Sequence, residues 1–229
     1  MMMAAHTQQK GKATEQAQSL LLDYAAGTLD EALSLIVATH LALSKSSRQF
    51  VSECEDIGGH MLAFDCEPKA MTAACLETVL KKIETKDRCA RQNGQHASSG
   101  SFYLDHIPLP APLSVALNPQ NLAWHKFIGG MEFIDVMKCG SSKAQLLRIA
   151  PAIKTPDHSH KGLEVTLILD GAFHDETGDY HVGDLIVEDE TTTHAPVSCP
   201  RQGCVCLTVT TAPIKLTGWM GTLINPFLR

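Results

Sequence analysis

The sequence predicts an α+β protein with more than one domain, in which a small helical bundle precedes an all-β domain. Three observations predict this class. Residues 16–84 carry apolar side chains at helical spacing. Residues 85–101 lose that periodicity and are rich in Ser, Gly, Gln and charge. From residue 102 onward, short β-prone runs alternate with Gly, Pro, Asn and Asp, as in antiparallel sandwiches and barrels.

Four helices are expected in the first part. QSLLLDYAAG, residues 18–27, predicts a helix that stops at Gly27, because glycine commonly terminates helices. Thr28 and Glu31 have the spacing of a capping box, so a second helix is expected from Thr28 through the apolar run ending at Leu43. Two further helices are predicted over residues 48–64 and 69–84. Such helices can form a small bundle, or they can wrap around a partner.

These patterns divide the chain of 229 residues into four parts. Residues 1–15 are expected to form a flexible tail and residues 16–84 a helical domain. Residues 85–101 have the composition of an exposed linker. Residues 102–229 are expected to form the β domain.

Charge and composition exclude several function classes. The formal net charge is −6 and no Lys/Arg block stands out, so direct nucleic-acid binding has little support. The N-terminus lacks an apolar signal segment and no run of 18 apolar residues occurs, so no membrane association is expected. We therefore expect a cytoplasmic protein, whose eight cysteines are reduced thiols rather than a disulfide framework.

A cluster of potential metal ligands lies in the β part. His158 and His160 share one face of an extended segment, and Glu164 has the same parity. His194 lies thirty residues further on, far enough for the chain to turn and return across the same barrel. Three imidazoles and one carboxylate suit a divalent zinc, iron, manganese or nickel ion. The alternative is a solvated loop that carries incidental histidines.

The pattern His158-x-His160-x3-Glu164-x6-Gly171, followed by Gly183-Asp184 and His194, resembles the two cupin motifs. Together with LLLDYAAGTLDEALSLIVATHLALS and GCVCLTVTTAP, it resembles the ChrR-type anti-sigma factors over nearly the whole chain. The resemblance implies a C-terminal cupin-type antiparallel β-barrel (jelly roll) that binds one divalent metal per domain, zinc being the first expectation. It also implies a helical domain that sequesters an extracytoplasmic-function (ECF) sigma factor, and it allows a homodimer formed through the cupin domain.

One part of the family pattern is missing. The family's helical domain usually holds zinc through an early histidine and a His-x3-Cys-x2-Cys motif. Here His40 is followed by Ser44 and Ser47 at the two cysteine positions, and the early histidine position falls near Gln16. Serine hydroxyls are poor zinc ligands compared with thiolates. We therefore expect no zinc in the helical domain, with His40 as the residual position of that site.

Cys204 and Cys206 are redox candidates, because CVC matches paired cysteines in the resembling family. Their Cα atoms would lie roughly 6.6 Å apart along a strand, at about 3.3 Å per residue, near the upper limit for a disulfide. Two reduced core thiols are the favoured interpretation, and an oxidant-sensing pair is the alternative.

Three functions are consistent with these features. The first is an anti-sigma factor whose metal-binding cupin domain senses oxidative stress or a small ligand, with no catalytic residues. The second is a metal-dependent, dioxygenase-like cupin enzyme with a helical oligomerisation domain. The third is a degenerate regulator that has lost sigma binding together with its zinc ligands. The match along the whole chain favours the first.

Overall fold

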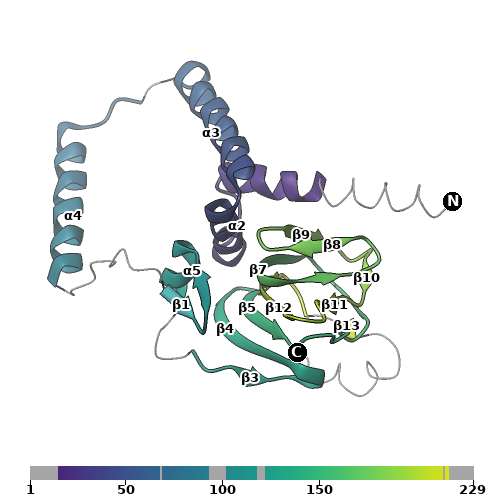
Figure 1. Cartoon of the computed structure of the whole chain (residues 1–229). Helices are drawn as coiled ribbons and strands as arrows, with labels where there is room; N and C mark the ends of the chain where they lie inside the picture. The colour runs from purple at the N-terminus through teal and green to yellow at the C-terminus, as the bar shows by residue number, and fades with distance from the viewer. Residues whose placement is uncertain (1–14, 68, 93–101, 118–121, 214, 217–229) are drawn as a thin grey trace.

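The computed structural model describes residues 15–67, 69–92, 102–117, 122–213 and 215–216. A helical N-terminal region is followed by an antiparallel β domain, which confirms the predicted fold class (Figure 1). The predicted tail lies outside the described residues except for Glu15, which is already helical. No helix in the described part of the chain has both the length and the apolar character needed to cross a membrane.

The helical elements begin with a helix over residues 15–25. The others are α2 (Glu31–Leu43), α3 (Lys45–Asp65), α4 (Ala73–Gln92) and the short α5 (Ala111–Ala116). Gly27 ends the first helix as predicted, since it adopts φ 69° and its N–H donates to the carbonyl of Tyr24. The first predicted helix therefore has the predicted end.

The cap of α2 differs from the predicted one. Asp30, rather than Thr28, is the N-cap residue, and its side chain accepts a hydrogen bond from the backbone N–H of Leu33 at 2.9 Å. The Thr28 hydroxyl instead donates to the carbonyl of Asp23. The predicted capping box between Thr28 and Glu31 is therefore wrong, because the first helix's C-terminal turn uses the Thr28 hydroxyl.

The boundary at residue 85 is also different in the structure. α4 continues to Gln92, eight residues into the predicted linker. Residues 85–92 contain no Gly or Pro to end the helix, and Gly94 is the first such residue after them. The remainder of the predicted linker, residues 93–101, lies outside the described residues.

The β strands are β1 (Phe102–Leu104), β2 (Ile107–Leu109), β3 (His125–Lys126), β4 (Met131–Cys139), β5 (Ser142–Ile149), β6 (His158–Ser159), β7 (Glu164–His174), β8 (Asp179–His181), β9 (Leu185–Glu188), β10 (Thr193–His194), β11 (Val197–Ser198), β12 (Cys204–Thr210) and β13 (Lys215–Leu216). A 3-10 turn, η2 (Ile128–Gly130), precedes β4. Every pairing among the described strands is antiparallel.

The long strand β7 organises the β domain. It pairs with β12 along its length, with β9 and β8 in succession on its other side, and with β11 at its end. β6 belongs to a separate three-stranded sheet, between β10 and β13. Gly171 in β7 has φ 70°, and an added Cβ would lie 2.2 Å from the carbonyl oxygen of Gly203. This close approach requires glycine at the end of the cupin-like motif.

The helical region and the β domain share one apolar core. Ile36 and Val37 of α2 belong to the same buried cluster as Leu146, Leu167 and Leu207 of the β sheet. Figure 1 shows α2 beside the barrel, whereas α3 and α4 project away from it. All side chains described in α4 are exposed. The described helices thus form an open arrangement around α2 rather than a closed bundle.

Candidate metal centre

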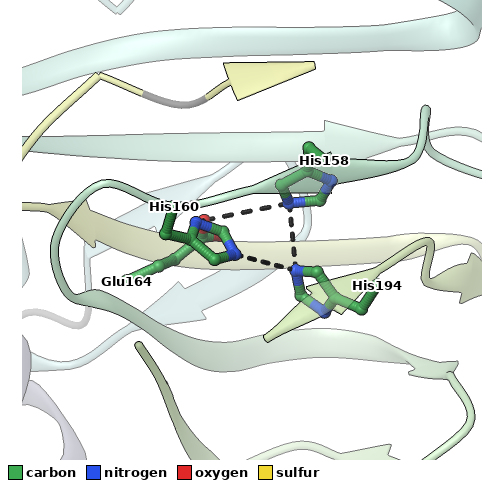
Figure 2. Close-up of side chains that lie close together, drawn as sticks. All are labelled: His158, His160, Glu164 and His194. Atoms are coloured by element: carbon green, nitrogen blue, oxygen red, sulfur yellow. Dashed lines mark hydrogen bonds and ion pairs between the residues drawn. The ribbon is translucent and has the colours of Figure 1, made fainter. Parts of the chain in front are cut away.

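The four predicted ligands come together inside the β domain. β6 pairs with β10 so that His158 lies opposite His194, and Glu164 begins β7 (Figure 2). His160 follows β6 by one residue. One potential ligand atom from each of the four residues lies within 4.8 Å of those of the other three. The spacing in the sequence and the strand register thus produce a single three-histidine, one-carboxylate cluster.

The distances in the cluster fit a metal ion. The Nε2 atom of His194 lies 3.0 Å from Nε2 of His158 and 3.3 Å from Nε2 of His160. Two nitrogens on a tetrahedral zinc ion, at about 2.0 to 2.1 Å each, would be separated by roughly 3.3 Å. Glu164 Oε2 lies 3.9 Å from the near nitrogen of His158. The nitrogens therefore have separations that one small cation can bridge.

The environment of the Glu164 carboxylate also favours a bound cation. Its Oε2 is 2.8 Å from Nδ1 of His160, yet it is buried and accepts no aligned hydrogen bond from the described residues. Burial alone favours the neutral acid, but the surrounding imidazoles hold the pKa of Glu164 below its ordinary value of 4.5. A buried, ionised oxygen without a full set of donors is costly unless a positive charge compensates it.

The three imidazoles are not equivalent. Burial lowers the pKa of His158 and outweighs the opposing charge of Glu164, and the neighbouring His194 and His160 lower it further, so the ring is neutral and able to act as a ligand. Its Nδ1 faces the carbonyl oxygen of Pro156 at 2.9 Å. This contact assigns the proton to Nδ1 and leaves the Nε2 lone pair directed at the cluster.

His194 has two carboxylate neighbours that the sequence analysis missed. Its Nδ1 lies 2.8 Å from Glu188 Oε1 and 3.6 Å from Asp175 Oδ2. Burial opposes charging of the ring, but these carboxylates raise the pKa of His194 to about 10. Carboxylates on the far nitrogen of a histidine ligand orient the ring and increase its basicity. The strand pairing would have identified Glu188, since it lies directly opposite Glu164 in the β7–β9 pair.

A cavity of about 120 Å³ adjoins the cluster. His158, Glu164 and His194 line one side, and apolar side chains form most of the rest, including Phe127, Met131, Leu147, Ile149, Phe173 and Cys206. A bound ion would therefore face a small, mainly apolar chamber on one side.

The two redox candidates lie in the core. Cys204 and Cys206 are buried free thiols on β12, and Cys206 contributes to the wall of the cavity. The adjacent Cys204, together with burial, raises the pKa of Cys206 well above its usual value of 9.0. A thiol held in its protonated form reacts slowly with oxidants. The oxidant-sensing role of this pair therefore stays a prediction, with the chemistry favouring two reduced core thiols.

The residual zinc position in the helical region has a different environment. His40 Nδ1 lies 3.0 Å from the carbonyl oxygen of Gly183, and its Nε2 lies 2.8 Å from the Ser47 hydroxyl. The Ser44 hydroxyl donates in turn to that of Ser47 at 2.9 Å. Burial lowers the pKa of His40, so the ring is neutral and each nitrogen has a partner of the required type. Among the described side chains, His40 belongs to no group of three potential ligands.

Comparisons with known proteins agree with these features. Residues 113–213 match the model of the ChrR cupin-like domain. The chain is 34% identical to the anti-sigma-E factor ChrR of Cereibacter sphaeroides over 216 residues, which cover 92% of this chain and 95% of that protein. It is also similar to a chain in the crystal structure of Rhodobacter sphaeroides SigE in complex with the anti-sigma ChrR, with 33% identity and a TM-score of 0.66 over 84% of this chain and 96% of that one. The chain therefore belongs to the ChrR family of anti-sigma factors.

Proposed function

We propose that this protein is an anti-sigma factor that holds an ECF-type sigma factor inactive through its helical region. Its relative in the SigE complex is matched over 96% of its length, so the helices and the cupin domain both have counterparts there. The observation in this chain that carries the proposal is the exposed apolar surface of α3 and α4. Sequestration needs a complementary surface and no catalytic group.

α4 has a continuous apolar stripe that nothing in the described chain covers. Leu76, Val79, Leu80 and Ile83 follow the i, i+3, i+4, i+7 spacing of one helix face, and each is about half exposed. A helix of this kind gains little stability in water without a partner for its apolar face. It is therefore suited to pack into an apolar groove of another protein.

α3 offers a second apolar stripe. Ile57, Met61 and Phe64 lie one turn apart, and Phe64 exposes 74% of its surface. Leu62 beside them exposes 69%. Contiguous exposed apolar surface of this kind marks an interaction site. α3 and α4 together supply two apolar faces for one sigma factor.

The test of sigma binding is co-expression of the full chain with its cognate ECF sigma factor. The wild-type protein should co-purify as a stable heterodimer. Leu80→Glu places a charge in the α4 stripe and should weaken the complex by tenfold or more, since buried apolar anchors dominate such interfaces. Thr78→Glu, which introduces the same charge on the opposite side of α4, is the matched control and should bind within about twofold of wild type. Equal binding by both variants would exclude the α4 stripe as the contact surface.

We propose further that the cupin domain holds one zinc ion through His158, His160, Glu164 and His194. Three imidazole nitrogens and one carboxylate oxygen suit zinc, and iron, manganese and nickel accept the same donors. When bound, the ion supplies the positive charge that Glu164 lacks. Metal analysis of full-length protein purified with its partner should give one equivalent per chain, and His160→Ala should reduce it to a trace. Retention of one equivalent in the variant would exclude this site.

The cavity beside the ligands is the proposed place where an oxidant or small ligand acts. It joins the candidate metal ligands to apolar side chains and to the Cys206 thiol. A molecule that enters it therefore contacts the ligand set directly. The cupin domain thus acts as the sensing part, and the helical region as the part that binds sigma.

A further inference from the structure

Within the described part of the chain, three side-chain hydrogen bonds connect the helical region to the β domain. Gln16 Nε2 donates to Asp189 Oδ2 at 2.7 Å, and His40 Nδ1 donates to the carbonyl oxygen of Gly183 at 3.0 Å. The third runs from the Ser142 hydroxyl to Asp30 Oδ2. Two of the three therefore end on one short segment, residues 183–189, which contains β9.

The same segment contacts the candidate metal centre. Glu188, the last residue of β9, lies opposite the ligand Glu164 and 2.8 Å from Nδ1 of the ligand His194. Asp189, which accepts the hydrogen bond from Gln16, is the next residue. A shift of this end of β9 therefore moves Glu188, which orients His194, together with Asp189, which is hydrogen-bonded to the first helix.

The side chains of β9 alternate between the two regions. Ile186 belongs to the apolar cluster that includes Cys204 and Cys206. Val187 belongs to the other cluster, which includes Ile36 and Val37 of α2. Because neighbouring strand residues face opposite sides, β9 presents one face to the barrel interior and the other to the core shared with the helices. In Figure 1, β9 lies between the body of the barrel and the helical region.

We propose that residues 183–189 couple metal binding in the cupin domain to the docking of the helical region on that domain. The inference rests on the proposed metal centre and adds the route by which its state reaches the sigma-binding helices. Coupling between two sites is reciprocal. If metal binding strengthens the contacts at Gly183 and Asp189, then loss of those contacts must weaken metal binding by the same factor.

The surroundings of His40 direct its Nδ1–H group at the carbonyl oxygen of Gly183. Ser47 donates to Nε2, which fixes the proton on Nδ1 and directs Nδ1–H at Gly183. Gly183 has φ 93°, and a Cβ added there would lie 3.9 Å from the Cβ of Leu43 at the end of α2. The positive φ favours glycine there, and the hydrogen bond from His40 connects this turn to α2.

The test measures zinc affinity of the full chain by competition with a chelator. Gln16→Ala/His40→Ala removes both described side-chain hydrogen bonds from the helical region to residues 183–189 without changing a candidate ligand, and it should lower zinc affinity by about five- to thirtyfold. The single variant Gln16→Ala changes one partly buried side chain and should give a smaller loss in the same direction. Circular dichroism must show native helix content in both variants.

Ser142→Ala is the matched control. It removes the third hydrogen bond between the two regions, which ends on β5 rather than on residues 183–189. It should leave zinc affinity within twofold of wild type. Unchanged affinity in the double variant, or an equal loss in Ser142→Ala, would overturn the proposed route. A wild-type protein that binds no zinc would instead refute the metal centre itself, so the two failures are distinguishable.

Discussion

The described part of the chain contains two buried histidine sites, and their ring nitrogens find partners in different ways. In the helical region, His40 donates to a backbone carbonyl and accepts from a serine hydroxyl, so both ring nitrogens have neutral partners. In the cupin domain, ring nitrogens of His158 and His160 face that of His194, beside a carboxylate oxygen without an aligned donor. Hydrogen bonds complete the first site, whereas the second has the donor set of a cation site.

The two histidine sites differ in the atoms that surround their imidazole rings. Ser44 and Ser47 occupy positions where the family usually has thiolates, and a hydroxyl can both donate and accept. At His40, neutral donors and acceptors can therefore satisfy both ring nitrogens without an ion. Imidazoles facing one another and a carboxylate cannot all be satisfied without added protons or an ion. A histidine thus indicates a metal site only when its neighbours supply further electron pairs and few protons.

The test with the largest expected effect converts the His40 site into a metal site. Ser44→Cys/Ser47→Cys replaces two hydroxyls by thiols that form thiolates on zinc, beside the His40 Nε2 that already contacts position 47. We expect the zinc content of the full chain to rise from one to two equivalents. Ser44→Ala/Ser47→Ala is the control and should stay at one. A double-cysteine variant that gains no zinc would show that serine is not what prevents metal binding there.

A second test removes an orienting charge from the cupin site while leaving all four ligands intact. Glu188→Gln deprives His194 Nδ1 of a carboxylate at 2.8 Å. Loss of such an outer partner typically costs 10- to 100-fold in metal affinity, and chelator competition should report a loss in that range. Glu190→Gln makes the same chemical change at an exposed residue two positions away and should have no effect. Wild-type affinity in Glu188→Gln would mean that His194 needs no carboxylate partner.

The sequence was sufficient to predict which four side chains cluster, but not the carboxylates that surround them. His158, His160 and Glu164 lie close together in the chain, and strand parity places them on one side. His194 was also predicted, because the chain has room to return across the barrel. Glu188 was missed, since an acidic residue at a strand end is common and its position opposite Glu164 depends on the β7–β9 register. Cross-strand register is not local information.

The helical region shows a second limit. The apolar stripe of α2 predicted a helix, and α2 forms, but periodicity does not identify what covers the stripe. Ile36 and Val37 pack with the β sheet, whereas the apolar face of α4 remains exposed. The end of α4 was placed too early because polar residues 85–92 were assigned to a linker, although none of them breaks a helix. Composition alone therefore does not indicate where a helix ends.

The smallest test concerns pH and the neutral His40. Burial holds the pKa of His40 below 6.5, so the unfolded chain takes up the proton first as the pH falls. The stabilisation from the neutral ring is therefore complete well above pH 6.5 and decreases below it. His40→Gln should cost about 1 kcal/mol of unfolding free energy at pH 8, and the difference from wild type should shrink at pH 5. Other titrating groups are common to both proteins and cancel in that difference. Denaturant titrations at the two pH values measure it, and a difference that grows on acidification would mean that the buried ring is charged.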